Sequence, residues 1–466
     1  MKIISSYSVQ IMKCDIKLDD TLRVYRSMLA ALIPAVDKHW DEIKAIGESR
    51  LAQRQLVEYL THSTSKHIAM YPEFDAKFCK YPSYLRRNTI TAAIGAVSSF
   101  RSLHENWDAG GRKGKEPKLQ VDRFACPCFF RDNMFSVVEA TAPTVDPTLP
   151  KFQQELLNMG RTLKVRLKVY YRGDWVWATT SLCKTDVQYL LKYWFHVASS
   201  APTLEKRYGK YYLRFAFEEN VALTCTPIEQ QTICAVDLGL NTDAVCSIMT
   251  PDGTVVARKF INFAAEKDQL YRVLNRIKRF QREHGSKDVQ SFWKFAQHKN
   301  DELSRKIAGA IIELAVRYSV DCIVFEHLDF CGKKAKSKRQ KIAMWRKCGI
   351  QDCVEHKAHR NGIHVSRICA WGTSSLAFDG SGKLTRNENN HALATLKTKK
   401  QYNADLNASY NIGARYFIRE LLKPLSEKAR SQLRAKVPAV GRRTSCTLAT
   451  LRLLVLEMQN LQQAAV

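Results

Sequence analysis

Residues 232–241 read TICAVDLGLN, and this stretch decides how the chain is interpreted. Its apolar part, residues 233–236, has the composition of a buried central strand, and Asp237 stands at the end of that strand. A carboxylate without a partner is costly at such a position, so a functional role has to be considered for it. Residues 244–261 then follow the pattern of a hairpin that turns at the sequence PDG.

Two further acids stand in comparable positions. The sequence DCIVFEHL, residues 321–328, predicts a second buried strand that carries Glu326 near its end. The sequence NADLNASYNIGARYFIRELL, residues 403–422, predicts a helix that opens at Asp405. The remaining patterns complete the order of an α/β unit with a mixed sheet, with helices at about 265–284, 300–318 and 340–360 and a strand at 363–368.

The three acids are far apart in the sequence, so only the fold can bring them together. In an RNase H-like sheet the first and fourth strands are neighbours and the following helix begins over their ends, so Asp237, Glu326 and Asp405 would meet at one rim. Carboxylates packed there raise one another's pKa values, and divalent cations relieve the repulsion. Hard oxygen ligands favour Mg²⁺ or Mn²⁺. We therefore predict a two-metal phosphodiesterase site in which Asp237 bridges both ions and the other two acids hold one ion each.

Each acid also has an ordinary interpretation. An aspartate after a strand is common in turns, Glu326 could end a surface strand, and Asp405 could cap its own helix. These readings are favoured for any one acid alone. The complete ordered set, with each acid in its expected context, favours the catalytic site.

At these residues the chain resembles the transposon-encoded TnpB nucleases and their descendants, the compact type V CRISPR effectors. Three motifs of their RuvC nuclease domain are similar to AVDLGLNTDAV, IVFEHL and ADLNASYNI here, and they occur in the same order. The matching residues are Asp237, Gly239 and Asn241 in the first motif, Glu326 in the second, and Asp405, Asn407, Ala408 and Asn411 in the third. Residues 357–375, KAHRNGIHVSRICAWGTSS, resemble the family's lead into its target-nucleic-acid-binding ribbon, and the resemblance covers residues 230–420 well.

The resemblance implies a multidomain α/β protein. Its C-terminal RuvC domain would have the RNase H-like fold, and its N-terminal β-barrel, wedge-like or OB-like, would be interrupted by an α-helical recognition domain. Strand patterns at 163–171 and after it, with basic outer faces and aromatic residues, fit such a barrel. The expected parts are the first wedge segment 1–20, the helical recognition domain 21–120, the second wedge segment 121–228, the first RuvC segment 229–363, a ribbon-like insert 364–404, and the last RuvC segment with C-terminal helices 405–466.

The insert departs from the family pattern. Many relatives carry a CxxC…CxxC zinc ribbon there, whereas residues 364–404 contain only Cys369. Four ligands for tetrahedral zinc cannot be assembled from Cys369, His364 and His391 alone, so we expect no zinc. We expect instead a ribbon held by the packing of Trp371, Leu376 and Phe378. A second group of residues has a spacing similar to that of a zinc site: Cys348, Cys353, His356 and His359. The stretch that contains them looks like a basic helix, so ordinary helix packing is favoured over a zinc site.

The charge of the chain points to a polyanionic partner. Lys and Arg total 73 against 45 Asp and Glu, which gives a formal net charge of +28. Nucleic acid is the usual partner of such a surplus, and a basic ribosome-associated or membrane-surface protein is the alternative. Two basic segments are candidate nucleic-acid contacts, although a solvated linker explains the first equally well: Arg112, Lys113 and Lys115, and Lys333, Lys334, Lys336, Lys338 and Arg339.

Together these features predict an RNA-guided DNA endonuclease. It would pair a guide RNA with one strand of double-stranded target DNA beside a short flanking motif and cut by the two-metal RuvC mechanism. The alternatives are a cleavage-deficient RNA-guided DNA-binding repressor and an RNA-independent RuvC-type nuclease. No apolar run approaches the roughly 18 residues of a membrane helix, so a cytoplasmic, prokaryotic, nucleoid-associated protein is expected. Monomer and dimer both remain open.

Overall fold

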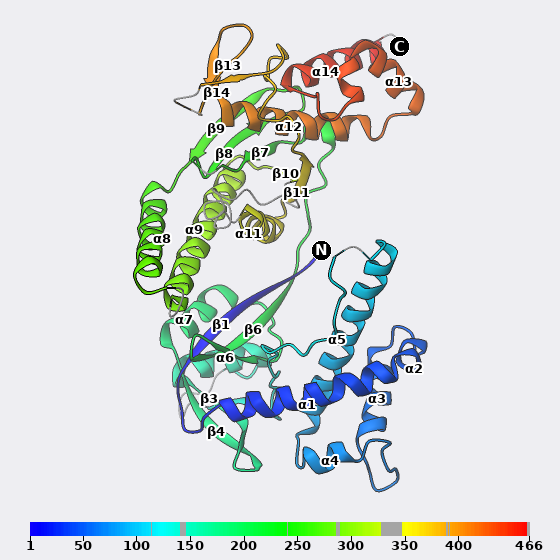
Figure 1. Cartoon of the computed structure of the whole chain (residues 1–466), viewed down its shortest axis with the longest axis vertical. Coiled ribbons are helices and arrows are strands. Elements are labelled where there is room, and N and C mark those ends of the chain that lie inside the picture. The colour runs from blue at the N-terminus through cyan, green and yellow to red at the C-terminus, as the bar shows by residue number, and fades with distance from the viewer. Residues whose placement is uncertain are drawn as a thin grey trace. The chain divides into compact units, whose positions relative to one another are not determined.

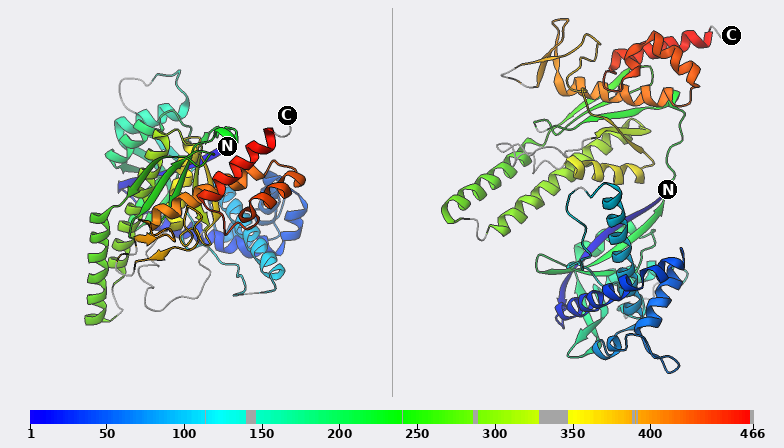
Figure 2. Two further views of the ribbon diagram at one scale, coloured as in Figure 1. Left: turned by 90° about the horizontal axis from the view of Figure 1, so that it is seen from above. Right: turned by 45° about the vertical axis from the view of Figure 1, so that its right-hand side comes forward.

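The computed structural model describes residues 1–112, 114–139, 146–239, 241–285, 289–327, 347–387, 390 and 392–463. The chain divides into two compact units (Figures 1 and 2). One comprises Lys2–Glu219, and the other comprises Asn220–Val466 together with Met1. Each unit is described by itself below.

The N-terminal unit is built on a six-stranded sheet with the order β2-β3-β4-β1-β6-β5. Strand β1 opens the chain, and five helices intervene before the sheet continues at β2 (Figure 1). The elements are β1 (Lys2–Cys14), α1 (Asp19–Lys38), α2 (Trp40–Ala45), α3 (Arg50–Thr61), α4 (Glu73–Lys77), α5 (Ser83–Ala109), β2 (Phe135–Val137), α6 (Lys151–Thr162), β3 (Lys164–Tyr171), β4 (Asp174–Leu182), α7 (Lys184–Trp194), β5 (Thr203–Arg207) and β6 (Lys210–Asn220).

The six-stranded sheet of the N-terminal unit is not closed into a barrel by pairing of its two edge strands. Within the described residues its edge strands β2 and β5 do not pair with each other. Instead, the segment just before β2 bonds to β5: the Leu204 N–H donates to the Pro127 carbonyl (3.0 Å) and the Phe129 N–H to the Pro202 carbonyl (2.8 Å). The predicted barrel is therefore a curled sheet whose far edge meets the chain ahead of β2.

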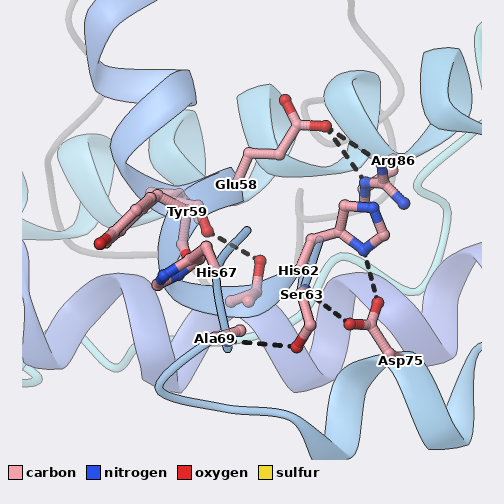
Figure 3. A network of polar contacts seen from close by, with 10 residues as sticks. Glu58, Tyr59, His62, Ser63, His67, Ala69, Asp75 and Arg86 are labelled. Atoms are coloured by element: carbon pink, nitrogen blue, oxygen red, sulfur yellow. Dashed lines mark hydrogen bonds and ion pairs between the residues drawn. The ribbon is translucent and has the colours of Figure 1, made fainter. Parts of the chain in front are cut away.

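The first part of the expected helical recognition domain, up to residue 61, consists of the three separate helices α1, α2 and α3. Gly47 adopts a φ of +79°, and Ser49 then caps α3 by accepting the Ala52 N–H. After α3 a polar loop replaces the helix (Figure 3). Asp75 bonds both the His62 ring (2.6 Å) and the Ser63 N–H (2.7 Å), as Figure 3 shows. Such polar bonds leave no mark in a hydrophobic pattern, so the pattern alone does not predict where α3 ends.

The C-terminal unit is built on a five-stranded mixed sheet with the order β11-β10-β7-β8-β9. Strands β7, β8 and β9 are antiparallel neighbours, whereas β10 and β11 run parallel to β7. The elements up to β11 are η1 (Ile228–Gln230), β7 (Ile233–Asp237), β8 (Ala244–Met249), β9 (Val255–Ile261), α8 (Ala264–His284), α9 (Gln290–Arg317), β10 (Cys322–His327), α11 (Lys347–Arg360) and β11 (His364–Cys369). The chain continues through β12 (Thr385–Arg386), β13 (Leu393–Thr395), β14 (Gln401–Asn403), α12 (Ala404–Leu422), α13 (Glu427–Lys436), η2 (Pro438–Gly441) and α14 (Leu448–Gln463).

Both faces of this sheet are covered by helices. Ile233 and Ala235 of β7 belong to the core shared with α12 and α14, whereas Cys234 and Val236 belong to the core shared with α9 and α11. Figure 1 shows the two pairs of helices on opposite sides of the sheet. Burial on both faces explains why β7 reads as a continuous apolar run. Its polar end is therefore the only part of the strand that can meet a ligand.

The insert after β11 forms a small three-stranded sheet, β12-β13-β14, that leads directly into α12. Phe378 packs against Tyr402 and Tyr410, with ring centroids 4.9 and 5.5 Å apart, and Leu376 is half-buried. The prediction that Trp371 helps to hold this ribbon is wrong, because its side chain is 77% exposed. Among the described helices none is long and apolar enough to cross a membrane.

Candidate active site

Asp237 and Glu326 lie at matching positions on neighbouring parallel strands. In the ladder between β7 and β10, Val236 pairs with Phe325, and the next residue on each strand is one of the two acids. The carboxyl ends of parallel strands meet at one edge of a sheet, so the two carboxylates share that edge. Both residues are half-buried, which leaves them within reach of a ligand.

Asp405 occupies the first turn of α12. The helix is capped by Asn403, whose side-chain oxygen accepts the Leu406 N–H (2.9 Å). Asp405 therefore does not serve as the N-cap, which removes its ordinary interpretation. Gly413 lets the helix lie close to the sheet, because a Cβ there would stand 3.2 Å from the Cβ of Ala235.

The other two carboxylates act electrostatically on Asp237. The pKa of Asp237 lies well above its ordinary value because of burial and, after burial, the charges of Glu326 and Asp405. Burial also raises the pKa of Asp405. Arg386 opposes both shifts from β12. The fold thus brings the three predicted acids together, and it adds an exposed arginine that the sequence interpretation missed.

Glu326 is held from two sides. Its carboxylate accepts a short hydrogen bond from the Thr373 hydroxyl. Its backbone carbonyl accepts one from the Gln351 side chain on α11 (3.0 Å). The next residue in the turn, Ser374, offers its carbonyl to the Arg386 guanidinium (3.4 Å). Residues 370–376, which we call the 370–376 turn, therefore contact both the acid and the arginine of the site.

Helix α12 fixes this turn through buried polar side chains. Asn411, fully buried, donates to the carbonyls of Thr373 (3.0 Å) and Leu376 (2.8 Å). Asn407 also donates to the Leu376 carbonyl (2.8 Å), and its own carbonyl accepts the Phe378 N–H (2.8 Å). The motif asparagines thus position the turn that holds Glu326. They do not enter the carboxylate group themselves.

The other motif residues shape the turn after Asp237. A Cβ on Gly239 would stand 2.6 Å from the Thr242 carbonyl oxygen, so only glycine fits without moving the backbone. The Asn241 carbonyl accepts from Lys267 (2.5 Å), which also pairs with the buried Asp243 (3.3 Å). The DLGLN sequence is therefore explained by backbone geometry as well as by the acid.

The chemistry of this donor set suits a hard divalent cation. Within the described residues no three His, Cys, Asp or Glu side chains are arranged around one metal position. Mg²⁺ does not require that, since proteins usually bind it through one or two carboxylates with water and substrate phosphates as the other ligands. The raised pKa of Asp237 reflects a repulsion that a cation would relieve.

The zinc-like spacing has a simple structural explanation. All four of its residues lie on the single helix α11, as the basic-helix interpretation predicts; they are Cys348, Cys353, His356 and His359.

The predicted nucleic-acid contacts are only partly described. Arg112 is exposed, pairs with Asp108 (2.9 Å) and lies over the Trp107 ring, while Lys115 is exposed. The other candidates lie outside the described residues: Lys113, Lys333, Lys334, Lys336, Lys338 and Arg339.

Comparisons with known proteins match part of the chain by sequence and most of it by structure. A family model described as the Aq_aa04 family matches residues 5–146, less than half of the chain. A search of curated proteins finds no match. In structure the chain is similar to compact type V CRISPR effectors.

Two of these structures illustrate the similarity. A Cas12f1–sgRNA–target DNA complex is 12% identical with a TM-score of 0.46, and the match covers 88% of this chain and 98% of that chain. The mini-RNA-guided endonuclease CRISPR-Cas_phi3 is 10% identical with a TM-score of 0.47, and the match covers 91% and 93% of the two chains.

Proposed function

We propose that this chain is an RNA-guided DNA endonuclease whose RuvC-type site consists of Asp237, Glu326 and Asp405. The observation that carries the proposal is that Asp237 and Glu326 end adjacent parallel strands and that Asp405, in the first turn of α12, acts electrostatically on Asp237. The same residues lie in the three motifs that resemble those of the RuvC domain in the TnpB and type V family. The net charge of +28 supports a nucleic-acid substrate.

The guide RNA follows from the family resemblance and from the size of the N-terminal unit. A nuclease that needed no guide would leave the 2–219 unit without a role. We assign guide and target binding to that unit, and cleavage to the residues from 229 onward. The protein would then read only a short flanking motif, and base pairing would supply the sequence specificity.

The carboxylates would hold two Mg²⁺ ions, with Asp237 contacting both and Glu326 and Asp405 one each. When bound, such ions activate the attacking water and stabilise the leaving 3′ oxygen of a phosphodiester. The chain's own residues position these groups. Thr373 fixes the orientation of the Glu326 carboxylate. The Arg386 guanidinium, which bonds to the Ser374 carbonyl and acts on Asp237, would bind a non-bridging phosphate oxygen.

The test begins with the RNA that purifies with the protein from its native locus. Sequencing should yield one structured species with a variable end, and that end names the DNA target. Wild-type protein with this RNA and Mg²⁺ should cut the target, and Asp237→Ala should abolish cutting while guided DNA binding persists. Asp268→Ala, which removes an exposed carboxylate on α8, is the matched control and should cut normally.

Two results would contradict the proposal. Residual cutting by Asp237→Ala comparable to wild type would reject the assigned site. The absence of any enriched RNA, with cutting retained, would replace the guided nuclease with an RNA-independent one.

A further inference from the structure

Trp371 is an exposed aromatic residue in the turn that follows β11. Strand β11 runs parallel to β10, with Cys369 paired to His327, so the chain leaves β11 at the sheet edge that carries Glu326. Trp371 follows two residues later, and 77% of its side chain is exposed. An indole with that exposure contributes little to the core, so its position at this edge calls for another explanation.

The backbone beneath this indole is fixed. The buried guanidinium of Arg415 donates to the carbonyls of Cys369 (2.9 Å) and Trp371 (2.8 Å). Gly372 supplies the left-handed conformation that the turn needs, with a φ of +82°. Thr373 then bonds back to the Ala370 carbonyl (2.9 Å). A ring presented from a fixed backbone loses little conformational entropy when it binds a ligand.

The groups around Trp371 favour nucleic acid as the ligand. Two residues of chain span at most roughly 7 Å, so Trp371 lies close to Thr373, which holds Glu326. Arg386 bonds to Ser374 of the same turn and acts on Asp237. The turn thus presents a flat aromatic surface, and it is bonded to a cation on β12 that acts on the proposed carboxylate site. Its other members include glycine, threonine and serines, which do not extend the indole into an apolar patch for a protein partner.

We propose that Trp371 stacks on an unpaired base of the DNA strand close to the phosphate that is cut. The inference rests on the proposed nuclease function and adds a residue that positions the substrate strand. A base inside a duplex has both faces covered by its neighbours, so stacking on Trp371 requires a strand that is single at the cut position. Trp371 is a positioning residue: it sets where along the strand the phosphate comes to rest.

Binding is tested with a single-stranded oligonucleotide that carries 2-aminopurine, added to the purified protein with its co-purified RNA and Ca²⁺. Quenching of the 2-aminopurine fluorescence reports stacking. Trp371→Leu and Trp371→Ala should bind roughly 5- to 100-fold more weakly and lose the quench, whereas Trp371→Phe should keep most of both. Tyr271→Ala, which removes an aromatic ring that is 55% exposed on α8, should bind as wild type does.

Cleavage in Mg²⁺ gives a second test that identifies the stacked nucleotide. One abasic position near the cut should lower cutting by wild-type protein to the rate of Trp371→Ala, and the same abasic position should cost the variant nothing further. This non-additivity is expected only if the missing base and the missing ring are partners. Because Trp371 is exposed, its variants should melt at the wild-type temperature.

The outcomes separate this inference from the proposed function. If wild-type protein cuts DNA and Trp371→Leu binds and cuts equally well, the stacking inference fails and the nuclease stands. Equal losses in Trp371→Phe and Trp371→Leu would also overturn it, since a ring would then have no advantage. If the quench depends on Trp371 but wild-type protein cuts nothing, stacking stands and the nuclease proposal fails.

Discussion

Asp237 combines an unfavourable electrostatic position with the most central place in the proposed site. Burial, followed by the charges of Glu326 and Asp405, raises its pKa well above the ordinary 3.8. The folded protein therefore binds this proton more tightly than the unfolded chain does. Stability must then fall as pH rises from the unfolded pKa through the folded one, and the penalty persists at higher pH.

We therefore expect Asp237→Asn to be more stable than wild type at neutral pH in EDTA. The difference in melting temperature should shrink as the pH is lowered toward the ordinary aspartate range, where the wild-type carboxyl is protonated in both states. Mg²⁺ should stabilise the wild type more than the variant, because ligands stabilise only the state that binds them. Melting curves over pH, with Asp268→Asn as control, decide the matter. Equal melting temperatures of variant and wild type at every pH would contradict the proposed cost of ionising Asp237 in the folded protein.

Arg386 gives a second prediction at the scale of one residue. Its charge opposes the raised pKa values of Asp237 and Asp405, so Arg386→Ala should move the acid limb of the pH–rate profile to higher pH. Loss of a phosphate contact should also lower kcat roughly 100-fold. Arg386→Lys should restore the acid limb but only part of the rate, because lysine lacks the planar fork of donors. Arg443→Ala, an exposed arginine elsewhere in the unit, should behave as wild type.

At the scale of an element, α12 does more than deliver Asp405. Its buried face carries Asn407, Asn411 and Arg415 at intervals of one turn, and all three bond to the segment that follows β11. The helix therefore sets the position of the 370–376 turn and, through Thr373, the orientation of Glu326. Two of the three carboxylates thus depend on one helix.

Removing one of these contacts should reduce stability and activity together. Asn411→Ala leaves the carbonyls of Thr373 and Leu376 and the Leu448 N–H without this partner in a buried region. We expect a loss of about 1–3 kcal/mol in urea unfolding and slower cutting. Asn361→Ala, an exposed residue with one bond to the Lys357 carbonyl, should cost less than about 0.5 kcal/mol. Unchanged stability in Asn411→Ala would show that water replaces these bonds.

Local sequence pattern predicts the elements that carry the site, but not the contacts between them. The ends of β7 and β10 and the start of α12 follow from apolar runs that stop at an acid, and the strand ladder confirms that β7 and β10 are neighbours. The role of Arg386 was not predicted because the sequence shows only one more basic residue there. It is the folding of the insert that brings Arg386 near the acids. Trp371 was predicted to pack because it is large and apolar, whereas the bonds of Arg415 hold its backbone and leave its ring outside.

At the scale of the whole molecule, the charge surplus is spread over both units and partly neutralised within them. Many surface cations are already paired with acids, as Lys80 is with Asp174 (3.0 Å) and Lys151 is with Asp132 (2.5 Å). A paired cation contributes less to phosphate binding than a free one, because its partner must be displaced or also repels the phosphate. Segments that contain many cations and no acids should therefore account for a larger share of the nucleic-acid affinity than their share of the cations.

Residues 331–348 hold eight Lys or Arg and no acid, so they provide the test of that argument. Neutralising five of them should weaken nucleic-acid binding and reduce the slope of log Kd against log salt by up to about 0.9 per lost phosphate contact; the five are Lys333, Lys334, Lys336, Lys338 and Arg339. The control removes the same total charge from five cations that are each paired with an acid: Lys80, Lys151, Arg317, Arg430 and Lys436. If net charge alone governed binding, both sets would change the slope equally. A larger change in the first set would locate phosphate contacts in 331–348, and an unchanged slope would make that segment a solvated surface.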